Sequence, residues 1–248
     1  IYSNTLWAAT CIARFLDPLG LVEIVGPDLG RGICPMYRGE FPYTAVPCPR
    51  IYRFPDYLWE SARLARSVQG EIIIAIKAFM DTLPLALIKK WTRGSKVVLY
   101  LDELDSAPFL ELSGRRRLGW AARSAHHPLE EPWCRWVESL SPWADRIVCS
   151  SRFLAKRFGG QVIPLGVDTD HFKPLDVQSA SLLKESLGLS GKKVIVFGGV
   201  ARPHKGIEVL LQAMMRPGLD ECVLLIVGPQ TDYLLKLCQC KQWLGRIY

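Results

Sequence analysis

The chain has 248 residues, is 49% hydrophobic and carries a formal net charge of +7. This length allows one large or two ordinary domains, and the apolar content suffices for sizeable cores. The longest apolar stretches are interrupted by Lys77 and Asp81, which excludes a membrane-spanning segment, and no signal peptide is visible.

The eight cysteines are scattered without the paired spacing of a zinc site. Cys238 and Cys240 lie close together, but no second pair or histidine cluster completes a ligand set. Cys149 lies in the apolar run RIVCSS and is typical of a small core residue. We therefore expect a reducing compartment, the cytoplasm.

The N-terminal part of the chain predicts a helix from Asn4, with an apolar face that includes Leu6, Ala9, Ala13 and Phe15. A strand over Leu21–Val25 is predicted to be closed by Gly26-Pro27. A long Gly- and Pro-rich loop follows, with a short strand at Tyr43–Val46. Because the first residue is not Met and the chain opens on a helix, we expect residues to be missing at both ends, a first strand among them.

The next segments alternate between helix and strand patterns. They predict a helix over Tyr57–Val68, a buried strand over Glu71–Ile76, a helix over Thr82–Trp91, a strand over Lys96–Leu101, a helix within Pro128–Ser139, a strand over Arg146–Cys149, a helix over Arg152–Phe158 capped by Ser150 or Ser151, and a strand over Gln161–Pro164. This alternation predicts an α/β fold with a parallel sheet covered on both faces. A polar connection over Asp168–Ser190 follows, with a short helix at Ala180–Leu187.

A second strand–loop–helix unit begins at Val194. Its buried strand, Val194–Phe197, ends at Gly198-Gly199, and the loop carries Arg202 and Lys205 before Gly206 opens a helix. Such a loop suits an anion, above all a diphosphate, although an ordinary turn with solvated cations fits the pattern equally well. A strand over Cys222–Val227, ended by Gly228-Pro229, and a helix over Tyr233–Cys238 complete the pattern.

Three ordered segments carry a family resemblance: WADRIVCSSRFLAKRFGGQVIPLGVDTDHFKP, then LGLSGKKVIVFGGVARPHKGIEVLLQAM, then VLLIVGP. In these segments the chain resembles retaining GT-B glycosyltransferases of the group-one, family-four type. A weaker likeness reaches back to Glu71, through EIIIAIKAF and KVVLYLDELD. It implies two Rossmann-like domains with parallel sheets, the acceptor domain in residues 1–172 and the start of the nucleotide-sugar donor domain, incomplete in this chain, in residues 173–248.

The family's donor loop has an Arg soon after its first Gly and a Lys just before a second Gly. The Lys position is Lys205 here, whereas the Arg position falls on Gly199, and the nearest cation is Arg202. The resemblance therefore implies a donor-diphosphate site made by Gly198, Gly199, Arg202, Lys205 and Gly206. Such cations would offset the charge that grows on the leaving diphosphate without a bound metal.

Many relatives carry a His just after the strand that matches Lys96–Leu101, and Asp102 takes that position here. A carboxylate at this end of a parallel strand can orient an acceptor hydroxyl or accept its proton, and Asp102 is therefore the candidate catalytic residue. It can equally cap the following turn. Glu103 and Asp105 are expected to be solvated. Lys77, at the end of the neighbouring strand, is expected to be exposed, with a position facing the same cleft as Asp102 as the alternative.

The resemblance implies transfer of a sugar from a nucleotide sugar to a glycan or lipid-linked acceptor, with retention of configuration and no metal cofactor. A pair of glutamates that binds the donor in this family is absent after Pro229, so we expect the 248-residue chain by itself to be nearly inactive. Two alternatives stay open, a GT-B-fold nucleotide-sugar epimerase and a non-catalytic relative that binds a nucleotide sugar or a partner. The replacements at Gly199 and Asp102 keep the last one open.

Basic residues form two groups, Arg115–Arg117 and the set around Trp91 made by Lys89, Lys90, Arg93 and Lys96. Each indicates either a solvated basic face or peripheral contact with the anionic cytoplasmic face of a membrane. No recognised motif indicates a nucleic-acid partner.

Three histidines adjoin candidate functional segments. His126 and His127 are adjacent, which favours a surface loop over a metal site, since adjacent histidines rarely bind one ion. His171, with Asp168 and Phe172, is expected to hold the chain where it crosses between the domains.

Overall fold

A computed structural model describes residues 4–30, 32–33, 39, 41–167, 169, 172–240 and 245–248. The chain divides into two compact units, Ile1–Asp168 and Thr169–Tyr248, which we name unit 1 and unit 2. Each has its own hydrophobic core.

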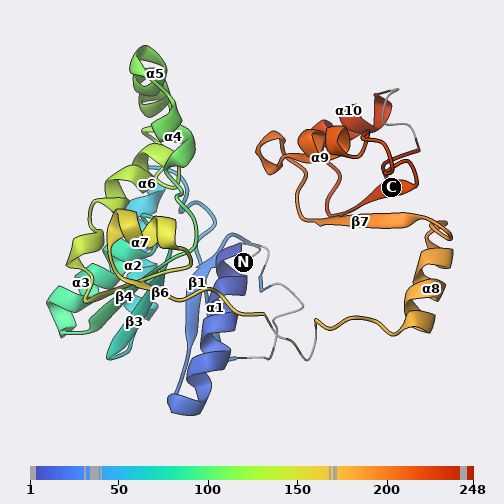
Figure 1. Cartoon of the computed structure of the whole chain (residues 1–248). Helices are drawn as coiled ribbons and strands as arrows, with labels where there is room; N and C mark the ends of the chain where they lie inside the picture. The colour runs from blue at the N-terminus through green and yellow to red at the C-terminus, as the bar shows by residue number, and fades with distance from the viewer. Residues whose placement is uncertain are drawn as a thin grey trace. The chain divides into compact units, whose positions relative to one another are not determined.

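The larger sheet of unit 1 has four parallel strands in the order β3-β4-β5-β6. The strands are β3 (Ile72–Ile76), β4 (Lys96–Leu101), β5 (Arg146–Cys149) and β6 (Gln161–Val162). Helices α2 (Asp56–Ser67), α3 (Leu83–Arg93), α6 (Glu131–Glu138) and α7 (Arg152–Phe158) surround it (Figure 1). Of its two inner strands, β4 is the more buried, with Val97, Leu99 and Leu101 in the core. The edge strand β3 exposes Ile72, so the expected burial of this whole strand was wrong.

A second, two-stranded parallel sheet in unit 1 pairs β1 (Ile24–Asp28) with β2 (Tyr43–Pro47). Helix α1 (Asn4–Leu16) packs on it through Leu6 and Ala13, which meet Ile24 in a small core. The expected end of the first strand at Gly26-Pro27 was wrong, since both residues lie inside β1. Ile24, Gly26 and Asp28 provide the ladder to β2, so the missing N–H of Pro27 costs no hydrogen bond there.

Unit 2 contains the parallel pair β7 (Lys193–Gly198) and β8 (Cys222–Val227). Helices α8 (Val177–Ser186), α9 (Ile207–Ala213) and α10 (Asp232–Gln239) accompany it. Ile195 and Phe197 of β7 pack against the core, whereas Val196 is 61% exposed. The expectation that both faces of β7 are covered is therefore wrong within the described chain.

The observed architecture confirms an α/β protein with parallel sheets. Two helices lie where the sequence predicted no element, α4 (Ala107–Glu111) and α5 (Gly114–Ser124), and they project from the body of unit 1 (Figure 1). Short 3-10 turns occur at η1 (Asp17–Leu19), η3 (Ser141–Trp143) and η4 (Pro203–Lys205). Within the described ranges, no helix is both long and apolar enough to cross a bilayer.

Candidate functional site

The first candidate site is the loop at the carboxyl ends of β7 and β8. The two ends are held backbone to backbone, since Gly199 N–H donates to the carbonyl of Val227 at 2.9 Å. A Cβ at Gly228 would lie 2.1 Å from the carbonyl oxygen of Gly199, so only glycine permits this approach. Gly199 itself has φ +132°, a conformation that disfavours side chains.

The following turn presents two cations to solvent. Lys205 N–H donates to the carbonyl of Arg202 at 3.0 Å within η4, and Gly206 then adopts the left-handed conformation at φ +72° before α9 begins. Arg202, His204 and Lys205 are exposed, and neither Arg202 nor Lys205 forms an ion pair with a described residue. The loop therefore offers positive charge and glycine backbone at the strand ends, where open parallel sheets bind ligands.

The second candidate site surrounds Asp102, at the carboxyl end of β4 in unit 1. Lys77 follows the neighbouring strand β3, and its Nζ lies 3.0 Å from Glu103 Oε2, 3.0 Å from Asp105 Oδ1 and 3.4 Å from Asp102 Oδ1. Its side chain is only 5% exposed. The expected exposure of Lys77 and the expected solvation of Asp105 were therefore wrong; Glu103 is half-exposed but also paired.

Burial and charge act in opposite directions in this acidic cluster. Burial lowers the pKa of Lys77, but the carboxylates of Asp105 and Asp102 outweigh it, and the net pKa is raised. Burial raises the pKa of Asp105 to about 6 despite the nearby ammonium. Asp102 Oδ1 is buried and makes no hydrogen bond of good geometry with a described residue, although the ammonium of Lys77 lies near it. Three carboxylates around one cation leave excess negative charge that can orient a hydroxyl or take up its proton.

Lys77 has a backbone conformation that few side chains adopt. Its φ is +69°. The N–H of Lys77 donates to the carbonyl of Tyr100 at 2.8 Å, and the carbonyl of Lys77 accepts a hydrogen bond from Thr82 Oγ1 at 2.7 Å. These bonds turn the chain sharply at the end of β3 and aim the ammonium at the carboxylates after β4. The sequence carried a signal for this, a single Lys directly after an isoleucine run, but the pattern did not reveal where that Lys pointed.

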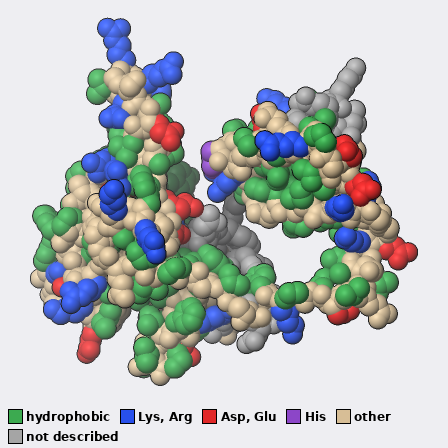
Figure 2. All heavy atoms as spheres, viewed as in Figure 1, with side chains coloured by type: hydrophobic (Ala, Val, Ile, Leu, Met, Phe, Trp, Pro, Cys, Tyr) green, Lys and Arg blue, Asp and Glu red, His purple; other side chains and the backbone are tan. Residues whose placement is uncertain are grey.

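In the basic group around Trp91, two of the lysines are buried or paired rather than exposed to solvent. Lys89 is 6% exposed, and Lys90 pairs with Asp145 Oδ1 at 3.0 Å. Trp91 and Trp143 are both exposed and meet edge to face at 5.2 Å. The second group is different, because Arg115 and Arg116 are exposed on the projecting α5, where Figure 2 shows basic side chains at the tip.

Two further sequence expectations concern ligand and hinge residues. Within the described residues, no group of three His, Cys, Asp or Glu side chains is placed to hold a metal ion. The ring centroids of His126 and His127 lie 4.0 Å apart with the two planes tilted by 42°, and His127 Nδ1 lies 3.1 Å from the carbonyl oxygen of Tyr52. The proposed hinge residues Asp168 and His171 lie outside the described residues.

Comparisons with known proteins assign no family to these sites. No protein-family model matches the chain, and no curated protein matches it.

Proposed function

We propose that the chain is part of a retaining glycosyltransferase of the GT-B type, which transfers a sugar from a nucleotide sugar to a hydroxyl of a glycan or lipid-linked acceptor. The observation that carries the proposal is the open loop after β7, with Arg202 and Lys205 exposed beside a glycine backbone. Unit 2 would bind the donor, and the acidic cluster of unit 1 would bind the acceptor. The reaction needs no metal if these cations offset the charge of the leaving diphosphate.

The proposed roles follow from the contacts of each residue. Arg202 and Lys205 have no described anionic partner, so a diphosphate would not have to displace an ion pair to reach them. Asp102 would orient the acceptor hydroxyl and accept its proton, with Lys77 as a positioning residue. Attack on the face from which the diphosphate leaves accounts for retention of configuration.

A second candidate function is nucleotide-sugar binding without catalysis. The position of Asp102 Oδ1, 3.4 Å from the ammonium of Lys77, favours it because this oxygen is already engaged in an ion pair and an acceptor hydroxyl would have to share it. The two functions differ in turnover. The protein is incubated with UDP- and GDP-sugars, with and without glycan and lipid-linked acceptors, and released nucleoside diphosphate is measured. Release that requires an acceptor supports transfer, release of an isomerised sugar supports the epimerase alternative, and binding without turnover supports the second candidate.

We expect Lys205→Ala to weaken binding of UDP or GDP at least about tenfold, equivalent to about 1.4 kcal/mol, since it removes one charge from the diphosphate site. Isothermal titration calorimetry of the protein at low and high salt measures this, and the loss of affinity should shrink as salt rises.

Lys236→Ala is the matched control, because Lys236 is an exposed lysine of the same unit that lies on α10. Equal affinities of wild type, Lys205→Ala and Lys236→Ala would refute the diphosphate assignment.

A further inference from the structure

The side chain of Thr231, immediately before α10, is bonded to the loop that follows β7. We name this loop, residues 200–205, the cation loop, because it holds the two exposed cations of the first candidate site. The hydroxyl of Thr231 donates a hydrogen bond to the carbonyl of Ala201 at 3.1 Å, and the same oxygen accepts one from Leu234 N–H at 3.1 Å. One hydroxyl therefore joins the cation loop to the first turn of a helix.

The other backbone hydrogen bonds of the cation loop leave it loosely attached. Lys205 N–H donates to the carbonyl of Arg202, so this bond lies within the loop. Gly199 N–H bonds to the end of β8, but it precedes the loop. Among the described residues, the bond from Thr231 is the one hydrogen bond that joins the cation loop to another element of unit 2.

Ala201 is the residue at which the loop leaves the core. Its side chain is 1% exposed and lies in the core of unit 2 with Ile207 and Leu211, whereas the next residue, Arg202, is exposed. The carbonyl of Ala201 and the N–H of Arg202 belong to one planar peptide group. A hydrogen bond that fixes this carbonyl therefore also fixes the direction in which the backbone of Arg202 begins.

We propose that Thr231 is a positioning residue of the diphosphate site, whose hydroxyl holds the cation loop in the conformation that presents Arg202 and Lys205 to a nucleoside diphosphate. The hydroxyl acts through the backbone of Ala201 and does not contact the ligand. Without this bond the loop has more conformations in the free protein, and ordering it on binding costs entropy that weakens affinity. The inference rests on the proposed function and adds a residue to its site.

A capping role alone does not account for both bonds of Thr231. Asp176 caps α8 in the same unit, where its Oδ1 accepts a hydrogen bond from Ser179 N–H at 2.9 Å. An ionised carboxylate can only accept, whereas a hydroxyl accepts and donates at once. Thr231 uses its donor for the cation loop, and this second bond is what distinguishes it from an ordinary cap.

The test measures the affinity of the protein for UDP and GDP by isothermal titration calorimetry. Thr231→Val has nearly the same shape but lacks both hydrogen bonds, and it should weaken binding at least about fivefold. Thr231→Ser keeps the hydroxyl and should bind within about twofold of wild type. A loss in Thr231→Ser as large as in Thr231→Val would overturn the role of the hydroxyl.

Asp176→Ala is the matched control for stability, because it removes a helix cap from the same unit without a bond to the cation loop. Urea unfolding should show that it destabilises unit 2, as Thr231→Val does. Its affinity for UDP and GDP should stay within about twofold of wild type. An equal loss of affinity in Asp176→Ala and Thr231→Val would assign the effect to general stability and overturn the proposal.

A double-mutant cycle with Lys205→Ala tests whether Thr231 acts through the cations. Because the positioning effect needs Lys205 in place, the loss of affinity in the double variant should be at least about twofold smaller than the product of the two single losses. Losses that simply multiply would contradict the positioning role.

The same measurements separate this inference from the proposed function. If Lys205→Ala weakens binding and Thr231→Val does not, the positioning role is overturned and the diphosphate site stands. If neither UDP nor GDP binds, or if Lys205→Ala leaves their affinity unchanged, the diphosphate assignment fails and the role of Thr231 fails with it.

Discussion

Lys77 shows how one side chain can join two strand ends. Its ammonium lies among three carboxylates from the segment after β4, and its backbone is left-handed. An isolated buried ammonium would be costly, so the carboxylates and the cation depend on one another. The same arrangement places Asp102 at the strand end, so stability and the proposed acceptor site share this contact.

We expect Lys77→Met to lower the free energy of unfolding of unit 1 by about 3–5 kcal/mol at neutral pH, since it leaves buried carboxylates without their cation. Met keeps the length of the side chain and has no more freedom than Lys at positive φ, so the backbone effect is matched. The loss should be smaller at pH 4.5, where the carboxyl of Asp105, whose pKa is about 6, is protonated. Urea unfolding at the two pH values measures these losses of stability. Lys156→Met is the control, because Lys156 is an exposed lysine on α7. An equal loss of stability in the two variants would contradict the role of Lys77.

Asp81 provides a separate pH dependence. Burial raises its pKa to about 6 from 3.8, so between these values the folded state binds more protons than the unfolded state. The contribution of Asp81 to stability is therefore fully present below pH 3.8 and is lost as the pH rises through 6. Asp81→Asn should remove this pH dependence. It should raise the free energy of unfolding by up to about 3 kcal/mol over wild type at pH 7.5, and by little near pH 4. Urea unfolding at the two pH values measures it; a gain independent of pH would rule out titration of Asp81 as the cause.

At the scale of single elements, helix starts differ in how they are capped. Ser151 accepts a hydrogen bond from Leu154 N–H at the start of α7, which decides between Ser150 and Ser151, the two caps that the sequence left open. Ser113 occupies the same position before α5 but makes no side-chain hydrogen bond there. The projecting α5, with Arg at three successive positions, has only Ser124 buried and was not predicted as an element.

Ser151→Ala should therefore destabilise unit 1 by about 1 kcal/mol, because it leaves an N–H of the first turn of α7 without its acceptor. Ser113→Ala should change the stability of the same unit by less than about 0.5 kcal/mol. Chemical denaturation of both variants measures the difference. Equal effects would mean that the cap at Ser151 contributes nothing to stability.

At the scale of the whole molecule, the two units have separate cores. Leu99 lies in the core of unit 1 and Leu224 in that of unit 2, and both are fully buried. Each core is built from its own parallel strands and the helices that follow them. Stability is therefore expected to be lost unit by unit.

Leu99→Ala and Leu224→Ala should each cost about 2–5 kcal/mol through lost burial and an unfilled cavity. Amide exchange should accelerate in the strands of the mutated unit and stay unchanged in the other. Each variant is the control for the other, and acceleration across both units in either variant would show that they unfold together.

Much of the architecture could be predicted from the sequence because periodicity reports burial. The strands Lys96–Leu101 and Arg146–Cys149 were located with their observed bounds, and the alternation of strands with helices led to parallel sheets. The order of glycines and cations after β7 likewise marked an exposed loop. These features are local, so neighbouring residues alone determine them.

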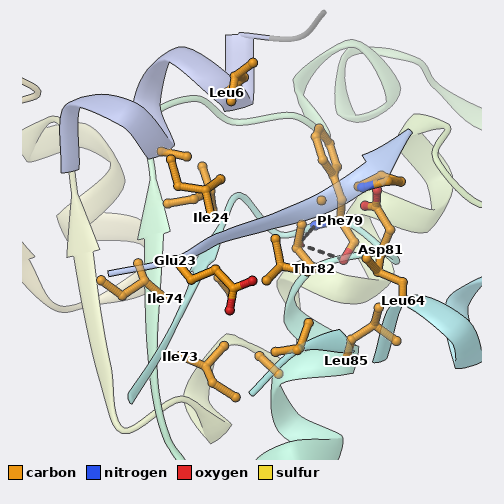
Figure 3. A pocket seen from close by; sticks show the side chains of 18 of the residues that line it. Leu6, Glu23, Ile24, Leu64, Ile73, Ile74, Phe79, Asp81, Thr82 and Leu85 are labelled. Atoms are coloured by element: carbon orange, nitrogen blue, oxygen red, sulfur yellow. Dashed lines mark hydrogen bonds between the residues drawn. The ribbon is translucent and has the colours of Figure 1, made fainter. Parts of the chain in front are cut away.

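Only the tertiary structure decided which groups meet. It showed Lys77 turned toward the carboxylates after β4, Gly228 in close contact with the backbone of Gly199, and residues of β1 and β3 lining one cavity (Figure 3). A one-dimensional pattern states that a side chain is apolar or charged, but not which distant residue it faces. Those contacts depend on strand order and on the direction in which each chain leaves its strand, and these are settled only when the sheets pack.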